Sequence, residues 1–275
     1  MRVLIVGLGL IGASYAKGLK NAGFEVYGVD INEDTINYAI ENGFVDEASV
    51  DATSFISKAQ IIILGLYPNQ IITFLKKYQT LFTKEQLITD VSGVKTNFIY
   101  EVSKYKGNAS YLTHHPMAGR EKMGIKYATP AIFKGANFLI CPVDNSENDI
   151  DKLKLIAKSL DFGRISIISP EKHDKMIGFT SQLTHAIACS LVNSDTDSDT
   201  KNFIGDSYRD LTRIAMINEE LWSELFMANR DYLLGEIQNF ELELNKMKEA
   251  ICTSDTKMLK SLFIKSCIKR SEMEK

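Results

Sequence analysis

The chain is 275 residues long, with 45% hydrophobic residues, 24% charged residues and a formal net charge of −3. This length is large for a single hydrophobic core and predicts two domains, while the composition is typical of an ordinary soluble globular protein. The near balance of charge and the lack of a Lys/Arg block give no reason to expect a nucleic-acid partner. Small molecules are therefore the expected partners.

The sequence shows no sign of a membrane segment or of a secretion signal. The apolar run at the N-terminus is too short to span a bilayer and contains three glycines. The cysteines lie far apart and form no C-x-x-C pair, which argues against a zinc site or a disulfide framework: Cys141, Cys189, Cys252 and Cys267. We expect reduced thiols, a cytoplasmic location, no membrane contact and no bound metal.

A strand followed by a glycine-rich turn opens the chain. Val3 to Val6 are apolar, and a Gly-x-Gly-x-x-Gly pattern follows at residues 7–12. The first glycine allows a tight turn, the second lets a pyrophosphate approach the backbone, and the third lets a helix over about 11–22 pack on the sheet. The start of that helix offers N–H groups to an anion. We predict that a dinucleotide binds here, through Gly7, Leu8, Gly9, Leu10, Ile11 and Gly12.

Asp30 indicates which dinucleotide binds. It follows a second apolar strand at 24–29 and lies eighteen residues after Gly12. A carboxylate at this place can accept hydrogen bonds from a ribose 2′-hydroxyl and would repel a 2′-phosphate, which favours NAD over NADP. The alternative is that Asp30 only caps the helix expected over 34–41, for which Asn32 is another candidate cap.

Strands and helices alternate through residues 1–168. Further strands are expected at 61–64, 87–91, 111–113, 137–141 and 165–168, with helices over 69–78, 95–104 and 148–160 between some of them. This alternation predicts an α/β fold with a Rossmann-type doubly wound parallel sheet in residues 1–168. Ligands in such sheets bind beyond the carboxyl ends of the strands. The strand ends expected to share one crevice are the glycine turn, the turn with Leu66 and Pro68, Ser92, and His115; Leu66, Pro68 and Ser92 thereby join the expected cofactor contacts.

From Ser169 onward the sequence predicts an all-helical domain over 169–275. Ser-Pro-Glu at 169–171 is a strong helix start. Helices are expected over 171–192, 205–216 and 218–248, with a last helix capped by Ser254. The helix over 218–248 carries an apolar stripe that a small domain cannot easily cover, so we predict a homodimer through the helical half. Burial of the stripe within one chain is the alternative.

His115 is the first candidate for acid/base chemistry. It follows the strand expected at 111–113, beside the predicted nicotinamide crevice, and Pro116 fixes the next turn. A neutral imidazole with a pKa of about 6.5 can accept a hydroxyl proton while hydride leaves the same carbon. Ser92 could orient that imidazole or the substrate hydroxyl, although Ser-Gly is also ordinary turn chemistry. The neighbouring His114 is expected to be a bystander or a packed strand residue.

Polar residues of the helical half could complete a substrate site. His185 lies in an otherwise apolar helix, either as a core histidine bonded locally or as a second polar contact in the crevice. Arg209 and Arg213 lie four residues apart on one helix face, where like charges destabilise. Asp210 can neutralise one of them, which leaves the other for a substrate carboxylate; a solvated basic face is the alternative. Two further cations follow the His115 turn: Arg120 and Lys122.

Three segments, together with the glycine turn, resemble the prephenate/arogenate dehydrogenase family. They are His-Pro-Met-Ala-Gly at 115–119, Asp-Val-Ser-Gly-Val-Lys at 90–95, and Arg-Asp-Leu-Thr-Arg-Ile-Ala at 209–215. The resemblance runs along nearly the whole chain, in the same order. The first and third segments are specific to the family, whereas many dehydrogenases share the glycine turn.

The resemblance implies a Rossmann domain followed by a helical dimerisation domain. It also implies an NAD-dependent oxidoreductase of tyrosine biosynthesis, which converts prephenate to 4-hydroxyphenylpyruvate by oxidative decarboxylation. The catalytic histidine of the family corresponds to His115, the supporting serine to Ser92, and a second active-site histidine to His185.

The resemblance also implies a substrate site, and here the chain departs from the family. The arginine that binds a substrate carboxylate corresponds to Arg213, and Asp210 and Trp222 match supporting positions. Many members have histidine where Gln182 stands and a small hydroxyl residue where Arg120 stands. Because both positions are expected to bind substrate, the choice between prephenate and arogenate stays open.

Two other interpretations remain. A related NAD-dependent β-hydroxyacid dehydrogenase would usually rely on a lysine in the first long helix of the second domain. Lys172 and Lys175 lie at the start of that helix, but His185 occupies its middle. A redox-sensing protein that binds NAD(H) without turnover would need neither His115 nor the arginine pair.

Overall fold

The structure, a computed structural model, describes residues 1–120 and 122–274. Its contacts divide the chain into two compact units, Met1–Asn229 and Arg230–Lys275. The boundary expected between residues 168 and 169 lies inside the first unit and stays a prediction.

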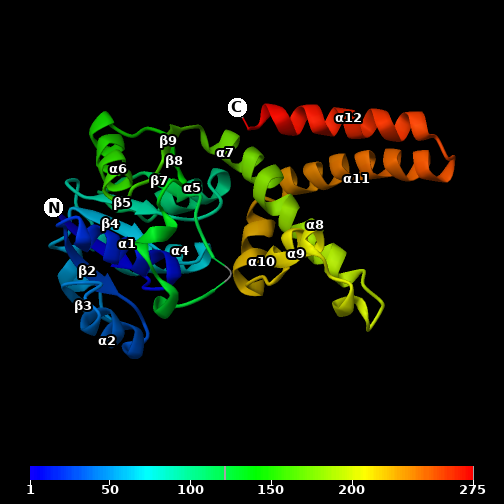
Figure 1. Cartoon of the computed structure of the whole chain (residues 1–275). Coiled ribbons are helices and arrows are strands. Elements are labelled where there is room, and N and C mark those ends of the chain that lie inside the picture. Colours follow the sequence, from blue (N-terminus) through cyan, green and yellow to red (C-terminus); the bar gives the residue numbers. More distant parts are fainter. Residues whose placement is uncertain (121, 275) are drawn as a thin grey trace. The chain divides into compact units, whose positions relative to one another are not determined.

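A parallel sheet forms the centre of the first unit (Figure 1). Its six strands follow the order β3-β2-β1-β4-β5-β6, and the order reverses between β1 and β4, as at the switch point of a dinucleotide-binding sheet. The Rossmann-type fold predicted from the sequence is confirmed. The strands are β1 (Arg2–Val6), β2 (Glu25–Val29), β3 (Glu47–Ser49), β4 (Ile61–Leu64), β5 (Leu87–Asp90) and β6 (Ser110–Tyr111).

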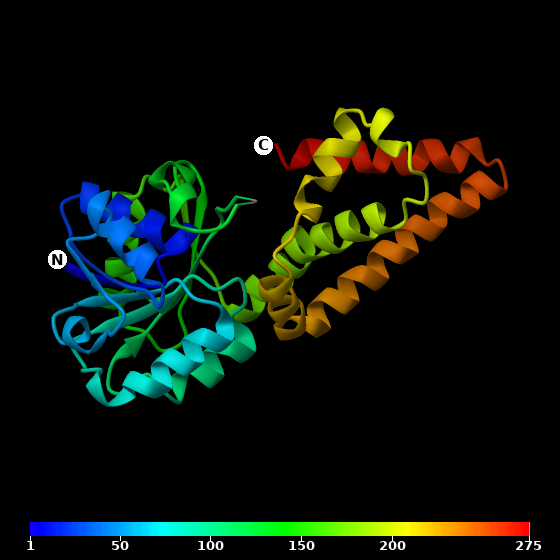
Figure 2. The ribbon, with the colours of Figure 1, turned by 90° about the horizontal axis from the view of Figure 1, so that it is seen from below.

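Helices cover both faces of this sheet. Consecutive strand residues point to opposite faces, so Val3 and Ile5 of β1 belong to one apolar core while Leu4 and Val6 belong to the other. Helices α1, α2 and α6 pack on the first core and α3, α4 and α5 on the second; Figure 2 shows α1 and α4 on opposite sides of the sheet. The helices are α1 (Leu10–Asn21), α2 (Glu33–Glu41), α3 (Thr53–Ile56), α4 (Pro68–Tyr78), α5 (Thr96–Ser103) and α6 (Glu147–Ser159).

The strands after residue 110 differ from the sequence prediction. The strand expected at 111–113 is divided: β6 ends the parallel sheet, and β7 (Thr113–Pro116) begins a separate three-stranded sheet. In that sheet β7 pairs antiparallel with β8 (Asn137–Cys141), which pairs parallel with β9 (Arg164–Ile167). An apolar run indicates a strand but not the sheet that it joins. The short β3 and α3 have no counterpart in the prediction, because three or four residues carry too little periodicity.

The first unit is helical after Ser169, as predicted. Ser169 Oγ accepts a hydrogen bond from the N–H of Lys172 and so caps the first helix. The helix expected over 171–192 contains a π-helical turn in its middle. The elements are α7 (Pro170–Ile177), the π-helical turn (Gly178–Gln182), α8 (Leu183–Asn193), α9 (Asp206–Thr212), a 3₁₀ turn (Arg213–Ala215) and α10 (Glu219–Ala228).

The prediction of one helix over 218–248 is wrong. The helix is interrupted at Asn229, which separates α10 from α11 (Arg230–Cys252). The buried Asn229 amide donates to the backbone oxygen of Asp174 at 2.9 Å and to Oε1 of Gln182 at 2.7 Å. These bonds hold Asn229 at φ −116° and ψ 24°, outside the helical region. Tertiary hydrogen bonds have here overridden a helical pattern.

The second unit is a pair of helices that pack against each other (Figure 1), α11 and α12 (Thr256–Glu272). Asp255, and not the expected Ser254, caps α12 by accepting a hydrogen bond from the N–H of Met258. Ser254 itself has φ +55° and lies in the turn before the helix. Throughout residues 1–120 and 122–274, every helix is too short or too polar to cross a membrane.

Candidate active site

The glycine turn has the geometry of an anion cradle. Gly7 has φ +87°, and a Cβ on Gly12 would lie 1.9 Å from the backbone oxygen of Gly7, so only glycine lets α1 approach the turn. A Cβ on Gly9 would meet no atom within 4 Å. Gly9 thus faces open space at the start of α1, where the first turn has neither a side-chain cap nor an acidic residue. Residues at this turn fit the pyrophosphate of a dinucleotide.

Asp30 ties the end of β2 to the glycine turn. Its Oδ2 accepts a hydrogen bond from the N–H of Leu8 at 2.8 Å, and its Oδ1 accepts one from the N–H of Asn32 at 3.0 Å. Asn32, and not Asp30, caps α2 by accepting from the N–H of Thr35. Since each carboxylate oxygen can accept a second bond, Asp30 keeps the capacity to bind ribose hydroxyls.

The turn after β4 lies against helix α10. Tyr67 is the N-cap of α4 and Pro68 its first residue, while Leu66 packs at the edge of the second core. The hydroxyl of Tyr67 accepts from Asn218 Nδ2 at 3.1 Å, and the N–H of Asn69 donates to Glu224 at 3.2 Å. The expected turn with Leu66 and Pro68 therefore joins the end of the parallel sheet to the start of α10.

Adjacent histidines on β7 point to opposite faces, as strand geometry requires. His114 is fully buried: its Nε2 lies 2.8 Å from the hydroxyl of Tyr15 and its Nδ1 2.7 Å from Oγ1 of Thr89. The expectation of a packed strand residue is confirmed for it. His115 is half-buried, and a Cβ built on Gly93 would lie 3.8 Å from its Cε1. The candidate base thus lies beside the turn that follows β5.

The partner of His115 is a histidine that the sequence analysis missed. Nδ1 of His115 lies 2.9 Å from Nε2 of His173, and Nδ1 of His173 lies 2.8 Å from Oδ1 of Asp174. Asp174 also accepts the backbone N–H groups of Lys95 and Thr96 at the start of α5. His173 and Asp174 follow the strong helix start at 169–171, which was interpreted only as secondary structure.

The electrostatics around β7 keep these imidazoles neutral. Burial, then the charges of His173, Lys95 and His114, hold the pKa of His115 well below its ordinary value. Burial also lowers the pKa of His173, against the opposing effect of its bond to Asp174. Burial by itself would raise the pKa of Asp174, but hydrogen bonds from His173 and Thr96 hold it below its usual value. At neutral pH, His115 is therefore a free base and Asp174 a carboxylate.

A buried cation lies between β5 and β7. Nζ of Lys95 is fully buried and lies 3.2 Å from Asp90, 2.5 Å from the hydroxyl of Thr113 and 2.8 Å from the backbone oxygen of His114. The Tyr111 hydroxyl donates to the other oxygen of Asp90. Three acceptors satisfy the ammonium, as a buried charge requires. Lys95 thus fixes the backbone of β7 on which His115 stands.

Ser92 follows β5, but the structure gives it a different partner from the one expected. Its N–H donates to Asp90 at 2.8 Å, and its Oγ accepts from the N–H of Val94 at 3.4 Å. Within residues 1–120 and 122–274, the imidazole of His115 is bonded by His173 and not by Ser92. A contact between Ser92 and a substrate hydroxyl or the cofactor stays a prediction.

Gln182 ends the π-helical turn, and His185 lies on α8, the helix after it. Nδ1 of His185 lies 2.9 Å from the backbone oxygen of Ser181, and its ring stacks on Trp222 with 3.6 Å between the ring centres. Gln182 is 1% exposed; its Nε2 donates to the backbone oxygen of Leu225, and its Oε1 accepts from Asn229. The amide of Gln182 thus bonds to α10 and to Asn229. A contact between Gln182 and substrate stays a prediction.

The arginines of α9 and the next turn line a cavity of about 410 Å³. Arg209 pairs with Asp206 at 2.8 Å, a carboxylate that the sequence analysis did not consider, and Asp210 is exposed. Arg213 contributes to the same cavity. Arg120 is exposed after β7, and Nζ of Lys122 lies 4.7 Å from the ring centre of Tyr127. A shared site for Arg213, Arg120 and His115 stays a prediction.

Comparison with known families then decides the class of the protein. Residues 15–163 match the model of the nucleotide-binding domain of prephenate dehydrogenase, and residues 169–265 match that of its dimerization domain. The chain belongs to the prephenate/arogenate dehydrogenase family. It is an NAD-dependent dehydrogenase. The assignment of the glycine turn and Asp30 to NAD binding stays a prediction.

Relatives within this family carry more than one name. Prephenate dehydrogenase of Lactococcus lactis is 29% identical over an alignment of 283 residues. The alignment covers 99% of this chain and 77% of that protein. A structure of Aquifex aeolicus prephenate dehydrogenase with hydroxyphenyl propionate and NAD+ has a TM-score of 0.89 at 28% identity and covers 99% of this chain and 98% of its own. Arogenate dehydrogenase of Synechocystis has a TM-score of 0.84 at 27% identity, with 99% and 100% covered. Family membership alone therefore leaves the substrate open.

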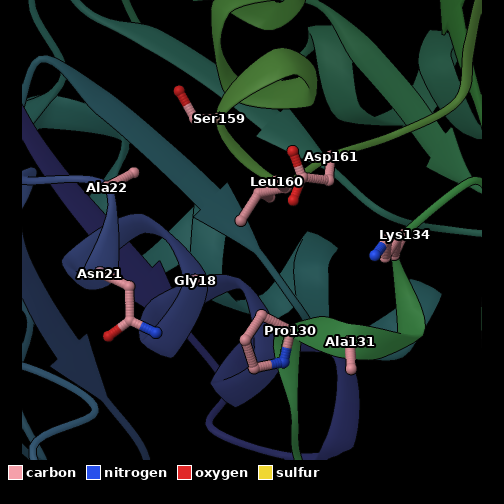
Figure 3. A pocket seen from close by; sticks show the side chains of 9 residues that line it. All are labelled: Gly18, Asn21, Ala22, Pro130, Ala131, Lys134, Ser159, Leu160 and Asp161. Atoms are coloured by element: carbon pink, nitrogen blue, oxygen red, sulfur yellow. The ribbon is translucent and has the colours of Figure 1, made fainter.

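A second cavity lies away from these residues. It has a volume of about 270 Å³ and lies where α1 and α6 end, at the opposite end of α1 from the glycine turn (Figure 3). Leu160, Pro130 and Lys134 are among its lining residues. It contains none of the residues that the sequence assigned to a site.

Proposed function

We propose that this enzyme is a prephenate dehydrogenase, which converts prephenate to 4-hydroxyphenylpyruvate and CO₂. The observation that carries the proposal is the neutral imidazole of His115, held by His173 beside the Gly93 turn of an NAD-binding sheet. A base at this place suits a substrate with a hydroxyl on the carbon that loses hydride. The site therefore needs to hold one hydroxyl, two carboxylates and the nicotinamide in fixed positions.

The chemistry of prephenate assigns a simple role to each protein group. Bound NAD+ supplies the hydride acceptor. His115 takes the proton of the C4 hydroxyl while the C4 hydrogen leaves as hydride, which makes C4 a ketone. The bond from C1 to its carboxylate then breaks, the electron pair enters the ring, and the oxygen on C4 becomes a phenolate. His115 returns its proton to that oxygen, so the base is regenerated without net proton release.

The cations after β7 and α9 support prephenate over arogenate. Both substrates carry two carboxylates, but arogenate has an ammonium group where prephenate has a ketone. Arg120, Lys122 and Arg213 would attract carboxylates and oppose an ammonium group nearby. Arg213 is the residue that we assign to a substrate carboxylate, with Asp210 and Trp222 in support. Arogenate dehydrogenase is the alternative.

The geometry of α7 disfavours a β-hydroxyacid dehydrogenase. Lys172 and Lys175 are both exposed, whereas the buried face of α7 carries His173 and Asp174. A lysine that acts on substrate would need to share the face that meets His115. The base-and-partner arrangement at His115 favours a hydroxyl proton as the group removed.

We also propose a homodimer that forms through the helical half. The match to a dimerization domain at 169–265 supports this, as do apolar side chains that α11 and α12 leave exposed: Leu242, Leu244, Phe263 and Ile264. Exposed apolar stripes of this kind favour a protein partner. We expect the enzyme to act in the cytoplasm, where its four free cysteines would stay reduced.

The deciding experiment compares kcat/KM of the purified enzyme for prephenate and for arogenate, each with NAD+. NADH absorbance measures the rate. We expect a higher kcat/KM for prephenate, with 4-hydroxyphenylpyruvate as the product by chromatography. A higher kcat/KM for arogenate would replace the proposal with its alternative. Absence of NADH with both substrates would contradict both.

A further inference from the structure

Three side chains form a continuous hydrogen-bonded chain behind the site. It runs from His115 on β7 to His173 and then to Asp174, both on α7, with separations of 2.9 Å and 2.8 Å. His173 is fully buried and Asp174 is 2% exposed. Water cannot readily exchange partners with these groups, so the protein alone sets which atoms carry protons.

The donors around Asp174 fix the direction of the chain. Its Oδ1 lies 2.9 Å from the N–H of Lys95 and its Oδ2 2.7 Å from the N–H of Thr96. Backbone N–H groups can only donate, so both oxygens act as acceptors. Together with His173 these donors hold the pKa of Asp174 below its usual value, so the group is a carboxylate. Nδ1 of His173 must then donate to Oδ1.

The same logic continues to His115. A neutral histidine that donates through Nδ1 has its lone pair on Nε2. Nε2 of His173 therefore accepts, and the group that it faces, Nδ1 of His115, must donate. This leaves Nε2 of His115 without a proton, on the side of the ring away from His173.

We propose that His173 and Asp174 are positioning residues that hold His115 in its Nδ1–H form, so that Nε2 is the base. The catalytic consequence rests on the proposed function, whereas the proton arrangement does not. Asp174 on α7 also accepts the N–H groups at the start of α5. These bonds fix the carboxylate, and with it the hydrogen-bonded side chains, to the backbone. Asn229 holds the carbonyl of the same residue.

Among residues 1–120 and 122–274, the other charged and polar groups next to His115 on β7 and α5 are bonded elsewhere. Lys95 donates its ammonium hydrogens to Asp90, Thr113 and the His114 carbonyl. His114 faces the other side of β7, where Tyr15 and Thr89 occupy both of its nitrogens. His173 is thus the polar partner that sets the form of His115.

The first test reads the proton directly and needs no substrate. The protein has four histidines, so ¹⁵N-histidine labelling with long-range ¹H–¹⁵N spectra can resolve each ring and assign it through single variants. We expect His115 and His173 both to be neutral and protonated at Nδ1 at neutral pH. A proton on Nε2 of His115, or a doubly protonated His173, would overturn the proposal.

The second test compares two variants of equal length. In His173→Gln, the amide oxygen can replace Nε2 as the acceptor, whereas His173→Met offers no comparable acceptor. We expect His173→Gln to keep the Nδ1–H form of His115 and to lose less than about tenfold in kcat. His173→Met should shift the proton of His115 to Nε2 and lower kcat by about 10² to 10⁴, the range for a lost or wrongly protonated base.

The control is His114→Gln, the same replacement of a buried imidazole on the other face of β7. We expect it to lower thermal stability while the proton of His115 and kcat stay unchanged. Equal kcat and equal spectra for His173→Gln and His173→Met would show that His173 only fills space. If wild-type protein turns over neither substrate, the proposed function fails, while the wild-type spectrum still decides the proton arrangement.

Discussion

The glycine turn and the His115 region are built in different ways. The turn uses residues that are adjacent in sequence, and backbone geometry fixes it: Gly7 has φ +87°, and Gly12 has no room for a Cβ. The His115 region gathers side chains from three distant segments, at 90–95, 113–116 and 173–174. The predicted cofactor site is thus a local property of the chain, whereas the proposed catalytic site depends on tertiary packing.

Removal of the imidazole should have the largest effect. For His115→Ala we expect kcat to fall by about 10² to 10⁴, the usual contribution of general acid/base catalysis, while the Kd for NAD+ changes little because the turn is built separately. Steady-state kinetics and a binding titration measure the two quantities. Near-normal turnover would remove His115 from the mechanism.

Two alanine variants of the glycine turn should separate folding from binding. Gly12→Ala puts a Cβ 1.9 Å from a backbone oxygen. We therefore expect the free energy of unfolding to fall by about 1–3 kcal/mol or more. Gly9→Ala meets no atom within 4 Å and should weaken NAD+ binding with little change in stability. Thermal melts with and without NAD+ measure both. Equal melting temperatures for the two variants would contradict the comparison.

Arg213→Ala should mainly raise KM for prephenate, by roughly tenfold or more, because a charged hydrogen bond contributes about 1.5–3 kcal/mol. The kcat should change less, since Arg213 is not assigned to the reacting carbon. Arg209→Ala is the matched control, because Asp206 already pairs with that guanidinium. An unchanged KM in Arg213→Ala would leave the residue as surface charge.

The pH dependence should distinguish the two regions as well. In the proposed mechanism His115 acts in its base form, and its pKa is lowered. We therefore expect kcat/KM to stay level as the pH falls through about 6.5, where an ordinary histidine protonates, and to decline only at a lower pH. Stability should behave differently. Unfolded histidines bind protons from about pH 6.5 downward, while His114, His115 and His173 in the folded protein do not. The free energy of unfolding should therefore fall as the pH falls through that range. Denaturant titrations at several pH values test this; a constant stability would contradict it.

The smallest effect is expected at Asp30. Asp30→Ala should relax the preference for NAD+ over NADP+ by removing the carboxylate that would repel a 2′-phosphate. The loss of its bond to Leu8 should also loosen the turn slightly. Comparison of kcat/KM for both cofactors measures the change. A wild-type enzyme that prefers NADP+ would already contradict this assignment.

The sequence predicts the local parts of the molecule well and the assembled parts less well. The strand, turn, helix and Asp30 of the first thirty residues lie where the glycine spacing places them, because each depends on neighbours in sequence. His173 was not predicted as a site residue because 58 residues separate it from His115. The helix start at 169–171 accounted for the residues around it without assigning it a role. Lys95 belonged to a quoted motif but received no role, since its three acceptors converge only in the fold.

The break at Asn229 shows the same limit. The apolar stripe of 218–248 predicts one helix, yet two hydrogen bonds from a single amide stop it. The partners of the Gln182 amide could not be predicted for a similar reason, because Leu225 and Asn229 lie 43 and 47 residues away along the chain.

The two imidazoles side by side on β7 make this strand sensitive to insertion and deletion. A slip of one residue along β8 would turn His114 and His115 each to the opposite face of the sheet, so that both imidazoles would meet the wrong neighbours. Loss or gain of a single residue at Leu112, which alone separates β6 from β7, should therefore lower activity more than most changes of side chain. The hydrogen bond from the Lys95 ammonium to the His114 carbonyl opposes such a change of register.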